Sequence, residues 1–190
     1  RRSAQTALYL ILDSLTKMFA PILAFTCDEI WKAMPHREGD DVRNVVLNTM
    51  NKPFAEYALS DEQLEKWAKL ISVRNDVNVV LEAARAGKRI GKSLEAAVSI
   101  AANNDASREL LGAISDLNLA ELFIVSSCTI SDCADCSEEA VKGEGAVNTG
   151  LSISVIESPG VKCPRCWMHS EAADGETGLC PRCAAVVANI

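Results

Sequence analysis

The chain has 190 residues, of which 48% are apolar and 24% charged, and its formal net charge is −7 at neutral pH. This apolar content is sufficient for a hydrophobic core and excludes a wholly disordered chain. The acidic balance argues against a general nucleic-acid-binding protein, because such domains are usually basic overall. No stretch approaches the roughly 20 consecutive apolar residues of a membrane span. We therefore expect a cytoplasmic protein without a membrane partner, and the start Arg1-Arg2-Ser3, which lacks a methionine, suggests a fragment of a longer protein.

The first third of the chain is predicted to be helical. Apolar residues recur at three- and four-residue steps and predict one apolar helix face, formed by Leu8, Ile11, Leu12, Leu15, Phe19 and Ile22. Pro21 predicts that this helix ends near Ala20 and that a second helix continues to about Met34. The polar stretch 35–59 is expected to be an ordered connection with little regular structure.

A third helix is predicted to begin at the capping box Ser60-Asp61-Glu62-Gln63. Its apolar face extends from Leu64 to Ala84, and Gly87 supplies a stop signal. The loop Gly87–Lys92, which is rich in glycine and basic residues, follows directly.

Beyond Glu95 the pattern changes to short strands. Strands are predicted over Ala97–Ala101, Leu122–Ser126 and Leu151–Ile156, with a helix near Ala106–Ser115. The acidic run Ser131–Thr149 is expected to be a mobile loop or a hairpin connection. Pro159-Gly160 then marks a boundary before a cysteine-rich end.

Two CPRC sequences dominate this end of the chain. Each presents two thiolates on one side of a tight turn, and two facing turns form the tetrahedral sulfur cage that zinc prefers. The sequence therefore predicts one structural Zn²⁺ held by Cys163, Cys166, Cys180 and Cys183. The arginine of each turn would offset the thiolate charge, and the tail should unfold without metal. Two disulfides or unbound thiols are the alternative.

The remaining cysteines and one histidine are weaker candidates. Cys133 and Cys136 form a third CxxC without a partner pair; free thiols are expected, although this pair could replace a terminal one or bind a second metal. Cys27 and Cys128 lie in apolar patterns and are expected in the core. His169 could be a ligand by its spacing, but four thiolates fill the site, so we expect it to be exposed or to face RNA.

Two segments have side chains suited to RNA binding, although the net charge of the chain is negative. Five basic residues stand against two acidic ones between Arg74 and Lys92, although a helix end with solvated side chains is the simpler alternative for this loop. Trp167 could stack on an unpaired base, a contact worth roughly 1–3 kcal/mol, or it could cover the zinc site. No catalytic constellation and no Walker or GxGxxG sequence is recognisable, so no catalytic residue is expected.

Three separated segments resemble a known family. Ala20–Trp31 looks like the helical anticodon-binding domain of class I aminoacyl-tRNA synthetases for aliphatic amino acids, and Trp67–Arg85 with Ile90–Ala96 is similar to a second signature of that domain. With Lys162–Trp167 added, the chain resembles the end of bacterial isoleucyl-tRNA synthetases, because the valyl and leucyl relatives lack this zinc knuckle. The resemblance explains Ser131–Thr149 least.

The resemblance implies an α+β fold in three parts: a helical anticodon-binding domain over residues 1–94, a small α/β junction over 95–158 and a zinc module over 159–190. It implies that Arg165 and Trp167 meet anticodon bases by hydrogen bonding and stacking, as suits single-stranded RNA. The basic run adds Arg85, Lys88, Arg89 and Lys92 as RNA-binding candidates.

The expected partners are isoleucine tRNA, through its anticodon stem-loop, and the catalytic domain of the same polypeptide; no DNA partner is expected. The full-length enzyme would ligate isoleucine to its tRNA with ATP. Both small substrates would bind in the missing catalytic part, so this chain should bind tRNA without forming a product.

Two other functions are compatible with the residues. A zinc-ribbon protein–protein adaptor fits the acidic balance and predicts no RNA affinity at physiological salt. A redox protein using CPRC or CADC would need a depressed thiol pKa in a βα setting, and the pairing of the two CPRC turns argues against it.

Overall fold

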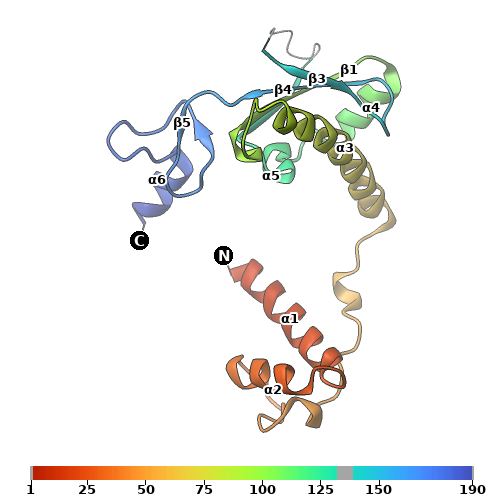
Figure 1. The fold of residues 1–190 in the computed structure, drawn as a ribbon. Coiled ribbons are helices and arrows are strands. Elements are labelled where there is room, and N and C mark those ends of the chain that lie inside the picture. Colours follow the sequence, from red (N-terminus) through yellow and green to blue (C-terminus); the bar gives the residue numbers. More distant parts are fainter. Residues whose placement is uncertain (1, 132–138, 190) are drawn as a thin grey trace. The chain divides into compact units, whose positions relative to one another are not determined.

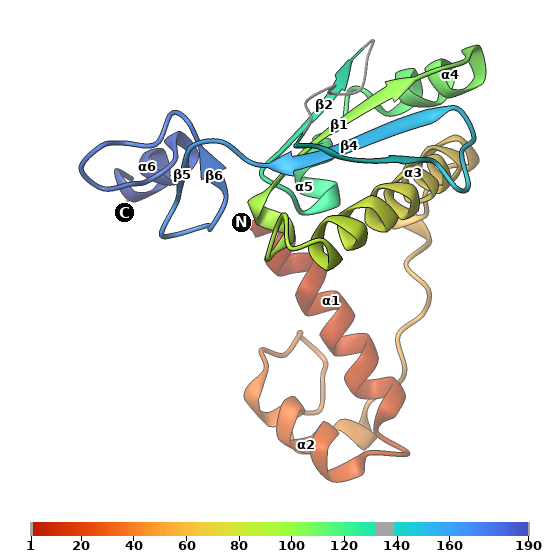
Figure 2. The same ribbon diagram turned by 45° about the horizontal axis from the view of Figure 1, so that its top comes forward.

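A computed structural model gives the fold (Figures 1 and 2) and describes residues 2–131 and 139–189. Its contacts divide the chain into two compact units, residues 1–58 and 59–190. Among the described helices, none is both long enough and apolar enough to cross a membrane.

The first unit is helical. Helices α1 (Arg2–Phe19) and α2 (Ala24–Ala33) are separated by a turn that contains Pro21, which confirms the predicted break. Two short 3₁₀ helices, η1 (Val45–Leu47) and η2 (Ala55–Tyr57), lie in the otherwise irregular stretch that follows. The expectation of little regular structure in that stretch is also confirmed.

The apolar stripe of α1 is not buried within this unit. The six residues of the predicted stripe, five in α1 and Ile22 in the turn after it, are 40–76% exposed. The buried residues of α1 are Asp13, Thr16 and Lys17. Asp13 forms ion pairs with Lys17 at 3.0 Å and with Arg37 at 2.8 Å. The periodicity therefore predicted the helix but not the face that this unit buries, because burial depends on which partners are present.

Trp31 is the largest residue in the small core of the first unit. Its Nε1 donates to the carbonyl oxygen of Asp41 at 3.1 Å, so its one polar atom is satisfied. The other buried residues of this core are Ala20, Cys27, Met34 and Val45. The expectation that Cys27 is a core residue is confirmed.

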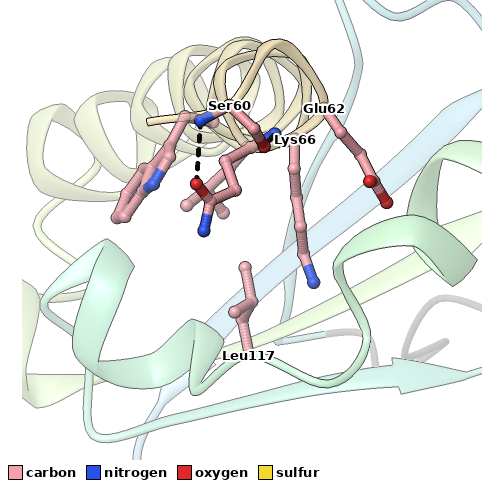
Figure 3. A pocket seen from close by; sticks show the side chains of 7 residues that line it. Ser60, Glu62, Lys66 and Leu117 are labelled. Carbon is pink, nitrogen blue, oxygen red and sulfur yellow. Dashed lines mark hydrogen bonds between the residues drawn. The ribbon is translucent and has the colours of Figure 1, made fainter. Parts of the chain in front are cut away.

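Helix α3 (Asp61–Ala86) begins the second unit at the predicted capping box. Ser60 Oγ accepts from the Gln63 amide at 3.3 Å. Gln63 Oε1 accepts from the Ser60 amide at 2.9 Å, the hydrogen bond drawn at Ser60 in Figure 3. The helix ends before Gly87, as predicted. The left-handed conformation after it is adopted by Lys88, with a φ of 55°.

A mixed four-stranded sheet follows the short helix η3 (Ser93–Glu95), with strand order β2-β1-β4-β3. Its strands are β1 (Ala96–Ala102), β2 (Ser127–Ser131), β3 (Val141–Glu144) and β4 (Leu151–Glu157). Helices α4 (Asp105–Ile114) and α5 (Leu119–Phe123) lie between β1 and the parallel strand β2. Strand β4 is antiparallel to both β1 and β3.

Helix α3 packs on this sheet. Val77 and Leu81 of α3 share one hydrophobic core with Val98 of β1 and Ile153 of β4, and α4 and α5 contribute to the same core. Three helices therefore cover one face of the sheet (Figure 2). The boundary between the two compact units falls before α3, whereas the sequence predicted a domain boundary after residue 94. The two differ because the buried face of α3 packs on the sheet. The three-part division remains a prediction.

The first and third predicted strands agree with β1 and β4, but the strand predicted over Leu122–Ser126 is wrong. Helix α5 extends to Phe123, Ile124 adopts a left-handed conformation with a φ of 60°, and β2 starts at Ser127. Phe123 and Val125 are buried. A short apolar run of this kind fits a buried helix or turn as well as a strand, which is why the pattern misled.

The acidic run is described only in part. Residues 132–138, including Cys133 and Cys136, lie outside the described residues. Its later part contains β3, which pairs antiparallel with β4 and confirms the hairpin alternative there.

The C-terminal module consists of the strands β5 (Val161–Lys162) and β6 (His169–Ser170) and the helix α6 (Pro181–Val187). Gly160 precedes β5 with a φ of 92°, and a Cβ atom there would lie 2.3 Å from the carbonyl carbon of Ser170. Only glycine fits at this close approach of two backbones.

Candidate metal centre and nucleic-acid interface

Four cysteine sulfur atoms meet in the C-terminal module. The Sγ atoms of Cys163, Cys166, Cys180 and Cys183 all lie within 4.8 Å of one another, and those of Cys166 and Cys180 are 3.7 Å apart. Tetrahedral zinc with Zn–S bonds of about 2.3 Å places its sulfur ligands about 3.8 Å apart. The two CPRC turns therefore face each other, and their donor atoms fit a four-thiolate zinc site.

Local hydrogen bonds shape both turns. In the first, the Trp167 amide donates to the Cys163 carbonyl at 2.8 Å, and the Cys163 amide donates to the Met168 carbonyl at 2.9 Å. In the second, Pro181 occupies the first turn of α6, and Cys180 is the N-cap residue. Proline suits this position because its fixed φ is helical and it has no amide hydrogen to satisfy.

The arginines of the two turns face the sulfur cluster. Arg165 Nη1 donates to Cys183 Sγ at 3.6 Å, and a hydrogen bond with Cys166 raises the pKa of the Arg182 guanidinium. Both cations offset negative charge on sulfur, as the sequence predicted.

The thiols differ in how readily they ionise. Burial raises the pKa of the Cys163 thiol, but hydrogen bonds from the backbone amides of Cys180, Cys166 and Arg165 outweigh it and lower the pKa to about 6. At Cys180 the Cys183 amide lowers the pKa, but burial and hydrogen bonds with the neighbouring thiols raise it to about 11. Four thiolates require a cation between them, and a divalent metal is the cation that this donor set selects.

Trp167 is displayed at the surface. Its side chain is 59% exposed, which favours the stacking alternative over a cover for the metal site. Its backbone has a φ of 68°, in the left-handed region where a residue with a Cβ atom is disfavoured by roughly 1–2 kcal/mol. Glycine would meet the same geometry without this cost, so the structure keeps a large aromatic side chain at a position that favours glycine.

The loop Gly87–Lys92 presents three of the predicted RNA-binding side chains. Ile90 is 5% exposed and anchors the loop in the core of the second unit. The exposed residues with cationic side chains are Lys88, Arg89 and Lys92. Their charges are available to a phosphate backbone.

Arg85 is set apart from this group. Its guanidinium forms an ion pair with Glu82 and donates to the hydroxyl of Ser93. These contacts direct the side chain toward the protein, so Arg85 braces the end of α3 against η3.

The prediction that His169 is exposed is wrong. It is half-buried, its amide donates to Ser126 Oγ at 2.7 Å, and its Nδ1 lies 3.2 Å from the Ser158 carbonyl oxygen. The ring therefore faces the junction instead of solvent. Ser126 and Ser158 were missed by the sequence reasoning, and no pattern in the sequence marks either of them.

None of the cysteines in the described ranges forms a disulfide. Cys128 is half-buried and packs against the core of the second unit, and burial raises the pKa of its thiol to about 12. Cys133 and Cys136 lie outside the described residues, so their predicted state stays a prediction.

A cavity of about 510 Å³ at the start of α3 is separate from these candidates (Figure 3). It contains none of the predicted site residues. Lys66 at its wall is paired with Asp116 at 2.8 Å. The lining residues are Ser60, Glu62, Gln63, Lys66, Trp67, Leu70 and Leu117.

Comparison with known families identifies the class of protein. Residues 1–100 match the family described as the anticodon-binding domain of tRNA ligase, and residues 160–186 match the zinc finger found in FPG and IleRS. The first match spans more than half of the chain, so the chain belongs to the anticodon-binding domain family of tRNA ligases. The second match includes all four clustered cysteines and supports a zinc site.

Individual relatives narrow the class further. The chain is 40% identical over 194 residues to a protein named isoleucine–tRNA ligase from Staphylococcus carnosus, covering 100% of the chain and 20% of the relative. Proteins of the same name from Geobacter sulfurreducens and Natranaerobius thermophilus are 38% and 41% identical, each over 98% of the chain and 20% of the relative. The chain spans about a fifth of the length of these relatives. The resemblance seen in the three motifs is confirmed.

Proposed function

We propose that the chain recognises the anticodon stem-loop of isoleucine tRNA as part of an isoleucine–tRNA ligase. The observation that carries this proposal is the similarity of nearly the entire chain to proteins of that name, together with its membership of the anticodon-binding family. The remainder of the polypeptide would bind ATP and isoleucine and perform the ligation.

Zinc has a structural role in this proposal. One Zn²⁺ held by Cys163, Cys166, Cys180 and Cys183 supplies the positive charge that four thiolates require. All four positions are protein ligands, so the ion keeps no position for substrate. Its contribution is to hold the turn that presents Arg165 and Trp167.

In this proposal the exposed side chains bind different parts of the RNA. The Trp167 indole provides a flat surface for an unpaired base. Arg165 is exposed although its Nη1 donates to Cys183 Sγ, and its guanidinium has further donors for a base edge. Lys88, Arg89 and Lys92 supply positive charge for phosphates. Arg85 acts within the protein, because its guanidinium is already bound to Glu82 and Ser93.

Backbone strain supports this assignment. Among the described residues, the non-glycine positions with a positive φ are Lys88, Ile124 and Trp167. Two of these three belong to the proposed RNA-binding set. Residues in strained conformations gather at functional sites, and Lys88 and Trp167 are both exposed.

Fluorescence anisotropy with a labelled isoleucine anticodon stem-loop tests the proposal, with a methionine anticodon stem-loop as the control RNA. The zinc-loaded chain should bind the isoleucine loop more tightly, and this preference should disappear when a chelator removes zinc. Equal, salt-sensitive binding to both loops would show that the chain binds RNA without a preference for the isoleucine anticodon. Absence of binding by folded, zinc-loaded protein would contradict the proposal and favour the adaptor function.

A further inference from the structure

The hydroxyl of Ser126 connects the junction to the zinc module. Ser126 is 9% exposed, and its Oγ donates to the Leu94 carbonyl at 2.5 Å and accepts from the His169 amide at 2.7 Å. A serine hydroxyl has one hydrogen to donate, and here that hydrogen points to η3 while the oxygen holds β6. One buried side chain therefore ties together two segments that are distant in sequence.

Glu95 connects the same segment to the basic loop. Its Oε2 accepts from the amides of Gly91 at 2.8 Å and Lys92 at 3.0 Å, and its Oε1 lies 4.0 Å from Lys162 Nζ. Its carbonyl oxygen accepts from the Ser158 amide at 2.7 Å. The hydrogen bonds from Lys92 and Gly91 lower the pKa of the Glu95 carboxyl, so the group is charged at neutral pH.

The contacts hold both strands of the zinc hairpin at the base of the cysteine turn. Lys162 and His169 are direct partners in the β5–β6 register. Lys162 immediately precedes the ligand Cys163, and His169 lies two residues after Trp167. The hairpin that carries the exposed indole is thus held on both sides of the cysteine turn, at Lys162 and at His169.

We infer that Ser126 and Glu95 form a docking seam that makes the basic loop and the zinc turn a single RNA-binding surface. The inference rests on the proposed function and adds two positioning residues to it. A loosely tethered zinc module would have to be ordered when RNA binds, and that ordering lowers affinity. The seam fixes Trp167 relative to Lys88, Arg89 and Lys92 before RNA arrives.

Substitution of Ser126 tests the seam directly. Ser126→Ala removes both hydrogen bonds, and we expect the zinc-loaded variant to bind the isoleucine stem-loop about tenfold more weakly, the effect of losing one or two net hydrogen bonds. Ser127→Ala is the matched control, because Ser127 is the exposed neighbour, and its binding should equal that of the unmodified chain. Zinc content and thermal unfolding show that both variants are loaded and folded.

A double-mutant cycle separates positioning from general destabilisation. Trp167→Ala is measured in the unmodified chain and in Ser126→Ala. If the seam positions the indole, the affinity lost through Trp167→Ala shrinks severalfold in the Ser126→Ala background. The same loss in both backgrounds would overturn the inference, because the indole would then act independently of the seam.

Amide hydrogen exchange provides a readout that needs no RNA. Glu95→Ala should accelerate exchange at Gly91 and Lys92, and Ser126→Ala should accelerate it at His169; unchanged exchange at these amides would show that no seam forms. If the unmodified chain binds the stem-loop tightly and Ser126→Ala binds it equally well, the inferred role of the seam is wrong. The proposed function would still stand. Failure of the unmodified chain to bind would overturn the proposed function and, with it, the RNA role of the seam.

Discussion

Asp76 of α3 and Asn148 of the β3–β4 turn are joined by two hydrogen bonds. Asp76 Oδ2 accepts from the Asn148 amide at 3.0 Å and from Asn148 Nδ2 at 2.7 Å, while Oδ1 accepts from the Val147 amide at 2.8 Å. The carboxylate is 1% exposed. A buried charge whose oxygens accept several amide hydrogens fixes the hairpin to the helix, in addition to the apolar core that the two share.

Asp76→Asn should therefore destabilise the second unit. An amide side chain accepts fewer hydrogen bonds than a carboxylate and turns an NH₂ group toward the Val147 and Asn148 donors, so we expect a loss of about 2 kcal/mol. Urea unfolding followed by circular dichroism measures it. Asp116→Asn is the control, because Asp116 forms an exposed ion pair with Lys66 and pairs of that kind contribute little. Equal effects of the two substitutions would contradict the role assigned to Asp76.

Acid should remove the same stabilisation. Burial raises the pKa of Asp76, but the hydrogen bonds from Val147, Asn148 and Ala146 outweigh it and leave the pKa below the ordinary value. The unfolded chain then binds the proton more readily than the folded chain, so this contribution is complete above an unfolded pKa of about 3.9. It is lost as the pH falls through the folded pKa.

The urea midpoint of the unmodified chain should fall on acidification from pH 5 to pH 3, and it should fall less in Asp76→Asn, which has no group to titrate at that position. Parallel pH profiles for the two proteins would show that other carboxyl groups determine the acid sensitivity.

Removal of zinc should unfold the C-terminal module and leave the sheet folded. The buried residues of the module are the ligands Cys163, Cys180 and Cys183, with Cys166 and Leu179 partly buried beside them. A cluster of thiols cannot replace a hydrophobic core, so metal binding and folding are coupled here.

Amide NMR spectra before and after chelation measure this effect. Signals from residues 160–187 should collapse to the shifts of unfolded chain, while those of β1 and β4 persist. Cys180→Ser should reproduce the apo spectrum, and Cys128→Ala should retain zinc, because Cys128 lies in the sheet. Retention of a dispersed module spectrum after complete zinc loss would contradict the structural role of the metal.

Substitution of Trp167 by glycine should relieve backbone strain, so the zinc module should become more stable while it binds RNA less tightly. Trp167→Gly removes the Cβ atom from a left-handed position, so the zinc-loaded module should become more stable by about 1 kcal/mol. The same substitution removes the indole and should weaken binding to the isoleucine stem-loop. Trp167→Ala retains a Cβ atom and should lose binding without the gain in stability. A glycine variant that is no more stable than the alanine variant would contradict the strain argument.

Local signals in the sequence predicted local features of the fold well. The capping box at Ser60, the break at Pro21 and the two CPRC turns all depend on residues close together in the chain, and the structure contains each of them. The run around Phe123 failed, because a short apolar segment does not distinguish helix from strand.

Long-range relationships were beyond the sequence. Ser126 and His169 are 43 residues apart, and neither belongs to a pattern that announces their contact. The buried pair of Asp13 and Lys17 replaced the expected apolar face of α1 for the same reason, since burial is decided by the residues that the fold brings together.

The affinity of zinc-loaded Trp167→Ala for the isoleucine anticodon stem-loop, compared with that of the unmodified chain at the same salt concentration, tests the central claim most directly. The exposed indole should contribute a stacking contact of roughly 1–3 kcal/mol, so the dissociation constant should rise by about fivefold or more. Trp167→Phe retains an aromatic face and should recover most of the affinity. Unchanged affinity in a zinc-loaded, folded Trp167→Ala variant would contradict the account, because the zinc turn would then not be reading the RNA.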